Sequence, residues 1–301
     1  MRLDRCYAQD TTVKNSTDGP VPGPAQELIL TLFGDYLLER PDPVWVGHLI
    51  ELLETLGVTP GAARTALSRM SGKGWLQSVR KRRLSFYRLT PKGRRLLEEG
   101  RERIHRPPRG TPWDGHWSVV TYTVPETTRE VRDRLRVRLM WLGLGPLGNG
   151  VWISPRDVGE SVREIARALG VGAGLQLFRG RFEGLGSPED LVARCWDLEA
   201  VDGEYREFMA RHRPPLERSI RELDRAGRLC PAEGFLLRFR LIHEYRRFPF
   251  MDPYLPPDFL PSEWPGDEAA KLFEEFHALL AGPAEEHVDW VLSNQGSRRI
   301  A

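Results

Sequence analysis

The sequence has few cysteines and no long apolar run. Its three cysteines, Cys6, Cys195 and Cys230, are odd in number and far apart, unlike a disulfide framework or a clustered metal site. No apolar stretch approaches the roughly 20 residues that a membrane span needs. The first 24 residues are polar, so no signal peptide is expected. We therefore expect reduced thiols and a protein that stays in the cytoplasm, away from membranes.

Motifs of common catalytic sites are missing as well. The sequence contains no HExxH run and no Gly-x-Ser-x-Gly nucleophile elbow. The neighbouring residues His243 and Glu244 could suggest acid–base chemistry or a metal site. However, no second histidine lies at the spacing that a metal site on a helix needs. His287 is expected on the surface of a last helix. We predict no catalytic residues, no metal and no cofactor, so the protein is not expected to be an enzyme.

Acidic residues are absent from one long stretch of the chain. Of the 44 lysines and arginines, eleven lie within residues 59–97, whereas none of the 42 acidic residues does. Because the net charge of the whole chain is only +2, the remainder is acidic. This segregation predicts a surface that binds a polyanion, although a solvated charged face would have the same composition.

The N-terminal region begins with a segment that cannot hold a helix. Residues 1–24 are rich in Thr, Asp, Gly and Pro, and we expect a disordered tail. Apolar residues then recur at three- and four-residue spacing over residues 28–37, which predicts an amphipathic helix. Pro41 and Pro43 should end it.

Two further helices are expected around a tight turn. The first covers about residues 46–56 and is closed by Gly57. The second should run over residues 60–72, because Thr59 can cap its N-terminus and Pro60 suits the first helical position. Two helices joined in this way predict a helix-turn-helix.

The second helix of this pair divides into an apolar face and a polar face. The face for packing carries Ala63, Ala66, Leu67 and Met70. A recognition helix needs such a division, with arginine and hydroxyl groups directed at the DNA, although an ordinary amphipathic surface helix would look similar. The residues predicted to contact bases or phosphates are Arg64, Thr65, Ser68 and Arg69.

A basic hairpin is expected next. Residues 75–79 and 84–89 read as two short strands separated by a basic turn, which predicts a wing that neutralises phosphates. Together with the helix that follows, to about residue 106, this predicts a winged helix-turn-helix domain over residues 25–108. The additional DNA contacts expected here are Lys73, Arg80, Lys81, Arg82 and Arg83.

Short motifs along the chain resemble one family of regulators. They include LFGDY at 32–36, VWVG at 44–47, RTALSR at 64–69 and WDGHW at 113–117, and the most specific is HEYRRFPFMDP at 243–253. Over about residues 25–285 the chain resembles the PaaX family, the repressors of bacterial phenylacetic acid degradation. The resemblance implies a homodimer that leaves double-stranded operator DNA on binding an aryl acyl-coenzyme A such as phenylacetyl-CoA. It also implies a winged helix, a ferredoxin-like middle domain and a helical C-terminal domain.

The middle region, residues 109–186, alternates strands and helices, which agrees with a ferredoxin-like α/β sandwich. The expected elements are strand 116–124, helix 129–142, strand 150–154, helix 158–169 and strand 175–184. A metal-dependent nuclease or another nucleic-acid-processing enzyme on this fold is the alternative function. The first strand, however, lacks the aspartate that CRISPR-associated nucleases place at its end. We expect the domain to serve dimerisation or to transmit the ligand signal.

The C-terminal region, residues 187–301, is expected to be helical, so that the whole chain is of the α+β class. One of its helices should cover about residues 232–248, with its apolar residues facing the core. A CoA thioester needs cations beside an aromatic cavity, and residues 243–253 contain both. The alternative is that this segment packs over the core while its arginines pair with Glu244 or Asp252. The residues predicted to bind the effector are His243, Arg246, Arg247, Phe248, Phe250 and Trp264.

Overall fold

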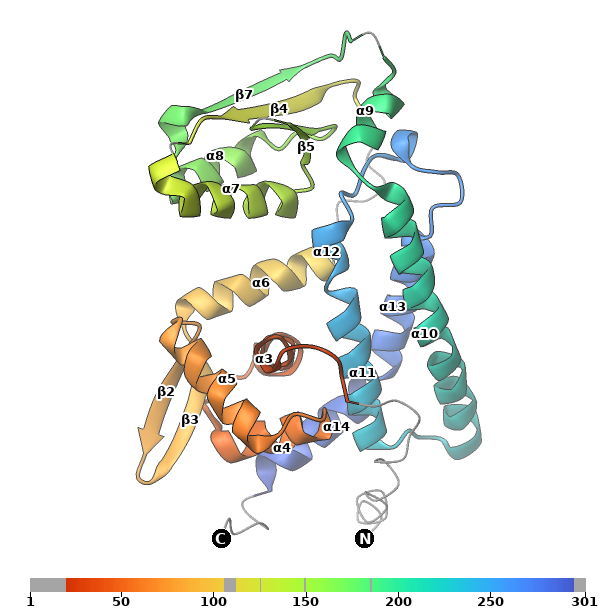
Figure 1. Ribbon diagram of the computed structural model, residues 1–301. Helices are drawn as coiled ribbons and strands as arrows, with labels where there is room; N and C mark the ends of the chain where they lie inside the picture. Colours follow the sequence, from red (N-terminus) through yellow and green to blue (C-terminus); the bar gives the residue numbers. More distant parts are fainter. Residues whose placement is uncertain (1–19, 106–111, 125, 149, 185, 295–301) are drawn as a thin grey trace. The chain divides into compact units, whose positions relative to one another are not determined.

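The computed structural model describes residues 20–105, 112–124, 126–148, 150–184 and 186–294 (Figure 1). The chain forms two compact units. Within the described residues, unit 1 combines 20–105, 208–246 and 268–294, and unit 2 combines 112–207 and 247–267. The helices α10 (Leu198–Ala226) and α13 (Gly266–Leu279) contribute to both. The units therefore divide the chain differently from the three domains expected from the sequence.

Unit 1 begins with helices and a small antiparallel sheet of order β1-β3-β2. Leu76 of β2 pairs with Leu89 of β3, and Lys81 pairs with Leu84, so that the hairpin turn consists of Arg82 and Arg83 alone. The expected turn of residues 80–83 was too long, because the ladder continues through Lys81. The elements are α3 (Ala25–Leu32), the π-helical turn η1 (Phe33–Leu37), β1 (Val44–Trp45), α4 (Val46–Thr55), α5 (Pro60–Gly72), β2 (Leu76–Lys81), β3 (Leu84–Leu89) and α6 (Pro91–His105).

A glycine makes the tight turn between α4 and α5. Gly57 has a φ of +87°, and its N–H donates to the carbonyl of Glu54 at 2.9 Å. The N–H of Val58 donates to the carbonyl of Leu53 at 3.0 Å, which completes a Schellman motif. A Cβ at position 57 would lie 2.6 Å from Pro20, so that both backbone angle and space require glycine.

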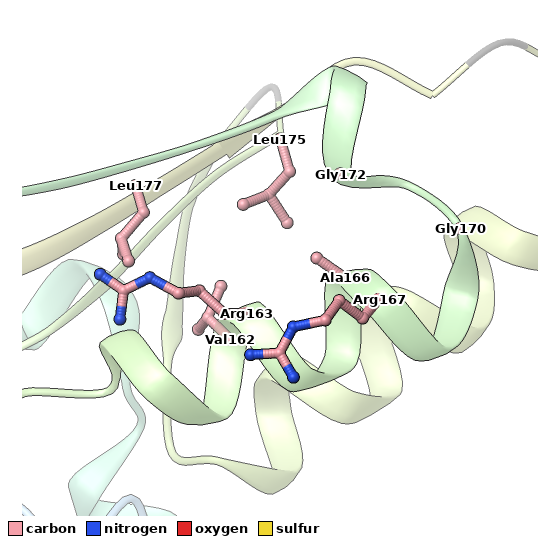
Figure 2. A pocket seen from close by; sticks show the side chains of 8 residues that line it. All are labelled: Val162, Arg163, Ala166, Arg167, Gly170, Gly172, Leu175 and Leu177. Atoms are coloured by element: carbon pink, nitrogen blue, oxygen red, sulfur yellow. The ribbon is translucent and has the colours of Figure 1, made fainter.

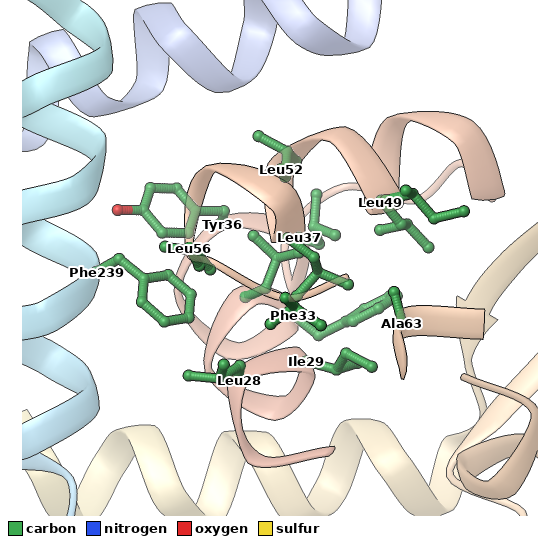
Figure 3. Close-up of a cluster of buried hydrophobic side chains, with 14 of the residues drawn as sticks. Leu28, Ile29, Phe33, Tyr36, Leu37, Leu49, Leu52, Leu56, Ala63 and Phe239 are labelled. Carbon is green, nitrogen blue, oxygen red and sulfur yellow. The ribbon is translucent and has the colours of Figure 1, made fainter. Parts of the chain in front are cut away.

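One hydrophobic core joins these N-terminal elements to two late helices, α11 (Pro231–Tyr245) and α14 (Ala281–Ser293). Phe235 and Phe239 of α11 are fully buried in it, together with Val288 of α14. Figure 3 shows Phe239 pointing from α11 toward the side chains of α3 and α4. The N-terminal elements therefore share their core with helices from the last third of the chain.

A buried cluster of charged residues also links the N-terminal elements to α11. The π-helical turn carries Asp35, whose carboxylate lies 3.2 Å from the guanidinium of Arg238 on α11. His277 of α13 lies 3.1 Å from the same carboxylate. The side chains of Asp35 and Arg238 are 5% and 8% exposed, so water screens this ion pair little.

Unit 2 holds a four-stranded antiparallel sheet of order β5-β6-β4-β7, built in the sequence strand–helix–strand–strand–helix–strand. This is the element order of ferredoxin-like units. The elements are β4 (Trp117–Tyr122), η2 (Glu126–Thr128), α7 (Arg129–Trp141), β5 (Gly145–Gly148), β6 (Val151–Ser154), α8 (Gly159–Leu169), η3 (Gly172–Gly174), β7 (Leu175–Gly180), α9 (Pro188–Cys195), α12 (Phe248–Met251) and η4 (Pro257–Phe259).

The two faces of this sheet are covered differently. Leu135 and Leu139 of α7, with Val162 of α8, pack on one face. On the other, Leu191 of α9 and Phe259 of η4 join Trp117 in a second cluster. Residues 254–260 therefore belong to unit 2 and pack beside its sheet, although they were expected to belong to the C-terminal region.

The α+β class expected from the sequence is confirmed. Further details differ from expectation. Strand β5 was not predicted, and the helix expected to reach residue 248 ends at Tyr245, before the separate short helix α12. His287, expected on the surface, is buried in α14. No helix among the described residues is long and apolar enough to cross a membrane. The expected tail and Cys6 lie outside the described residues, except for residues 20–24.

Candidate nucleic-acid interface and effector region

Local sequence fixes where α5 begins and which side it exposes. Thr59 caps the helix through a hydrogen bond from the N–H of Ala62 (3.4 Å), and Pro60 takes the first position. Ala63, Leu67 and Met70 are fully buried. This packing leaves the opposite face to solvent, and it exposes all four residues predicted to contact DNA: Arg64, Thr65, Ser68 and Arg69.

The hydroxyl of Thr65 is already engaged within the helix. It donates to the carbonyl of Gly61 at 2.9 Å. Its oxygen can still accept a hydrogen bond from a base amino group, but as a donor it would first have to leave this carbonyl. The other three side chains, Arg64, Ser68 and Arg69, point to solvent without such a bond to the carbonyl one turn earlier. They are therefore the better candidates for contact with DNA.

The hairpin of β2, its turn and β3 presents further cations. Arg80, Lys81, Arg82 and Arg83 are all exposed, as is Arg88. The ammonium of Lys81 lies 5.3 Å from the centre of the Phe86 ring, close enough for a cation–π interaction. Arg82 adopts a φ of +55°, which closes the two-residue turn. We call β2, this turn and β3 the basic hairpin.

Lys73 stands apart from the other predicted contacts. Its ammonium donates to Gln26 of α3 at 3.0 Å and lies 5.1 Å from the centre of the Trp75 ring. Its carbonyl accepts from Lys92 at 3.1 Å. Lys73 therefore also ties the end of α5 to α3, although its side chain is exposed.

The residues predicted to bind an effector divide between the two units. His243 and Arg246 belong to unit 1, whereas Arg247, Phe248, Phe250 and Trp264 belong to unit 2. The interpretation of residues 243–253 as one continuous binding segment does not anticipate this division.

In unit 1, His243 and Arg246 are occupied by neighbours from the N-terminal end. A ring nitrogen of His243 lies 2.9 Å from the Thr31 hydroxyl, and the other lies 3.1 Å from the carbonyl of Pro22. Burial, and then the positive charge of Arg246, lower the pKa of His243 to about 4. Arg246 itself pairs with Glu27 at 2.6 Å. Both residues thus fasten α11 to α3 and to the segment before it.

In unit 2, the residues predicted to bind the effector differ in how far they are exposed to solvent. Phe248 is buried and stacks on Tyr205, with 4.0 Å between the ring centres. Trp264 meets the same tyrosine edge-on. Phe250 is 58% exposed and packs on Trp141, while Arg247 lies 3.7 Å from Glu204. Phe250 and Arg247 are therefore the members of this set that a ligand could reach.

The acids named as alternative partners of the arginines have other partners. Glu244 lies 3.0 Å from Arg211 and 3.3 Å from His212. Burial raises the pKa of Glu244, but the hydrogen bond from His212 and the charges of His212 and Arg211 outweigh it, so that its pKa is lowered. Asp252 accepts a hydrogen bond from the Tyr205 hydroxyl at 2.7 Å.

One hollow was not found by sequence reasoning. It lies in unit 2 between α8 and β7, and Figure 2 shows Leu175 and Leu177 across from Ala166, with Arg163 and Arg167 beside them. Spacing on α8 signalled an amphipathic helix, but only the fold brings β7 alongside. The described residues hold no group of three or more His, Cys, Asp or Glu side chains that could bind a metal ion.

Comparison with known proteins covers nearly the whole chain. Residues 24–93 match the family description "PaaX-like protein", residues 110–192 match "PaaX protein central Cas2-like domain", and residues 196–290 match "PaaX-like protein C-terminal domain". The chain is 32% identical over 278 residues to Transcriptional repressor PaaX of Escherichia coli (strain K12), covering 91% of this chain and 86% of that protein.

A solved structure has the same fold. It is uncharacterized protein Rv0674 from Mycobacterium tuberculosis, with a TM-score of 0.51 and 24% identity over 88% of this chain and 98% of the other. The family matches span three consecutive regions, and the E. coli relative is similar over almost its full length. The chain therefore belongs to the PaaX family.

Proposed function

We propose that this protein is a transcriptional repressor of the PaaX type, not an enzyme, and that it grips operator DNA with a winged helix-turn-helix. The observation that carries the proposal is the acid-free stretch of residues 59–97. Eight of its eleven cations lie exposed on α5, at its C-terminal end or on the basic hairpin, and the other three lie on α6. The relative from E. coli is named a transcriptional repressor, which supports the same function.

The geometry of α4, α5 and the basic hairpin suits this task. A recognition helix enters the major groove with the side chains that its packing leaves exposed, and α5 exposes Arg64, Ser68 and Arg69. The basic hairpin follows α5 directly and can neutralise phosphates beside that groove. Arg82 and Arg83 occupy its tip, the part that extends furthest from the core of unit 1 (Figure 1).

We further propose that an aryl acyl-CoA such as phenylacetyl-CoA releases the protein from DNA, and that the active species is a homodimer. Family membership supports the effector. A symmetric dimer would recognise two half-sites on one face of the duplex, which suits a domain that presents a single recognition helix. The nuclease alternative is disfavoured, because β4 carries no carboxylate and ends at Tyr122.

A gel-shift assay tests the proposal as a whole. The protein is mixed with the DNA upstream of its own gene, with and without a panel of CoA thioesters and Mg²⁺. We expect a shifted band that phenylacetyl-CoA or a related thioester abolishes. Cleaved DNA would favour the nuclease, and the lack of any shift on this DNA would contradict the repressor assignment. Sedimentation of the same sample tests the dimer.

A further inference from the structure

A groove in unit 2 has an apolar floor and a cationic side. Its volume is about 570 Å³, within the roughly 300–1,000 Å³ of small-molecule sites. Val162 and Ala166 of α8 form the floor with Leu175 and Leu177 of β7 (Figure 2). Gly170 and Gly172 line one end and add no side chains.

Two arginines one helical turn apart border this floor. Arg163 and Arg167 share one carboxylate, that of Glu160, at 3.4 and 2.9 Å. The side chains of all three residues are at least 61% exposed, and ion pairs this exposed contribute little. The pair of arginines therefore keeps a net positive charge and can turn toward an anion with little loss of stability.

The strand beside the groove has an open side. β7 pairs with β4 and lies at the edge of the sheet, so that no strand among the described residues covers its outer backbone groups. Such an edge can exchange hydrogen bonds with the amides of an extended ligand. The groove thus combines an apolar surface, a sheet edge and two guanidinium groups within one short segment of the fold.

We propose that this groove is the acyl-CoA site, with phosphates at Arg163 and Arg167, the pantetheine amides along β7 and the acyl group on the floor. Each of the three features matches one part of such a thioester. The inference rests on the proposed function for the identity of the ligand as an aryl acyl-CoA. It moves the phosphate contacts from Arg246 and Arg247 to α8.

Calorimetry on the full-length protein with phenylacetyl-CoA tests the assignment. The Arg163→Ala/Arg167→Ala variant should weaken binding about 10- to 100-fold, as the removal of charge-assisted hydrogen bonds does. Gly172→Trp should also weaken it, because a Cβ there meets no atom within 4 Å and the indole can occupy the end of the groove. Glu160→Gln should tighten binding, since it frees both arginines, and a purely structural role would not produce that gain.

The matched control is Arg129→Ala/Arg134→Ala on α7. It also removes two exposed arginines of unit 2, one of them paired with Asp133 at four-residue spacing, and it should leave affinity unchanged. Equal affinity of the wild type and the Arg163→Ala/Arg167→Ala variant would overturn the inference. So would a Gly172→Trp variant that alters only the oligomeric state, because the groove would then be covered by a second copy.

The same variants separate this inference from the proposed function. Suppose that phenylacetyl-CoA binds the wild type and releases it from DNA, and that the groove variants respond as the wild type does. The effector then binds elsewhere, and only the groove assignment is wrong. If the wild type binds neither phenylacetyl-CoA nor any thioester of the panel, the effector half of the proposed function falls with it. Binding to DNA in the gel shift is decided independently of both.

Discussion

At the scale of single residues, His243 was predicted to contact a ligand but instead connects α11 to α3 and to the segment before it. Its Nε2–H donates to the carbonyl of Pro22, and its other nitrogen faces Thr31 and the Arg246 guanidinium. A proton added to that second nitrogen would point at a cation. The ring is therefore held neutral, in agreement with its pKa of about 4.

This makes stability depend on pH in a defined direction. The pKa of His243 in the folded protein lies below its ordinary value of 6.5, so that the unfolded chain binds the proton more tightly. Stability is then lost as the pH falls from 6.5 toward 4, by about 2 kcal/mol between pH 7 and pH 5. Urea unfolding at the two pH values should show this difference for the wild type.

The matched variant is His243→Gln, whose amide can still donate to Pro22 but does not titrate. It should lose stability at pH 7, because the fit to Thr31 is imperfect, yet lose about 2 kcal/mol less than the wild type on acidification. Parallel pH profiles for the two proteins would show that another group is responsible.

A second residue-scale prediction concerns the buried ion pair of Asp35 and Arg238. Asp35→Asn should destabilise the protein by about 3–5 kcal/mol, because it leaves the guanidinium buried without its charge partner. The double variant Asp35→Leu/Arg238→Met should recover most of this loss. Thermal unfolding of the wild type, Asp35→Asn and the double variant measures both effects. A double variant no more stable than Asp35→Asn would mean that the loss at Asp35 does not come from an unpaired Arg238.

At the scale of elements, α5 and the basic hairpin should contribute to DNA binding in different ways. Arg69→Ala should weaken binding to the operator by about 1–3 kcal/mol and spare unrelated DNA, if this side chain reads a base edge. Arg82→Ala/Arg83→Ala should weaken binding to both DNAs and reduce the salt slope by about one unit for each phosphate that is no longer neutralised. Fluorescence anisotropy at several salt concentrations separates the two patterns.

Arg221→Ala is the control for these variants, because it removes an exposed arginine that pairs with Glu217 on α10, outside the acid-free stretch. It should change neither the affinity nor the salt slope. Wild-type salt dependence in the hairpin variant would show that the hairpin does not contact DNA.

Elements with strong local signals were predicted well from the sequence. The cap at Thr59 and Pro60 places the start of α5 correctly, and its end at Gly72 was predicted too. Strand β5 was missed because Gly145, Pro146 and Gly148 disfavour a strand on their own, and only pairing with β6 holds them extended. The two-residue strand β1 is too short to leave a periodic signal. The π-helical turn lies within the periodic stretch of residues 28–37, so the sequence predicted a helix there but not its π-helical form.

The candidate sites likewise divide into those that depend on local sequence and those that depend on contacts made by the fold. Exposure of the DNA-contact residues on α5 could be predicted from helical periodicity, because it depends on one helix and its packed face. The groove beside β7 could not, since Arg163 and Leu177 are brought together by a crossover in the fold. For the effector residues, the sequence marked the aromatic and basic composition but not their partners, such as Glu27 for Arg246.

At the scale of the whole molecule, the shared core of unit 1 is the feature that sequence reasoning could least foresee. Periodicity indicated a buried face on α11 without indicating what covers it. The structure places Phe235, Phe239 and Val288 in the core of the N-terminal helices. Each buried side chain of this kind contributes about 1.5–3 kcal/mol, against a net stability of about 5–15 kcal/mol for a whole domain.

We therefore expect that residues 20–105 alone do not form a stable DNA-binding domain. Without α11 and α14, the apolar side chains of α3 and α4 that face them would be exposed to water. The isolated fragment should show no cooperative thermal transition and should bind DNA only weakly. A dispersed amide spectrum with sharp cooperative unfolding would contradict the shared core.

A milder change in the full chain tests the same coupling without relying on the solubility of a fragment. Phe239→Ala leaves a cavity between α11 and the N-terminal helices and should cost about 3–5 kcal/mol. Because Phe239 lies on α11 and not on α5 or the basic hairpin, any accompanying decrease in operator affinity must reach α5 through the core. Conversely, a protein that unfolds more easily but binds DNA with unchanged affinity would restrict α11 to a role in stability.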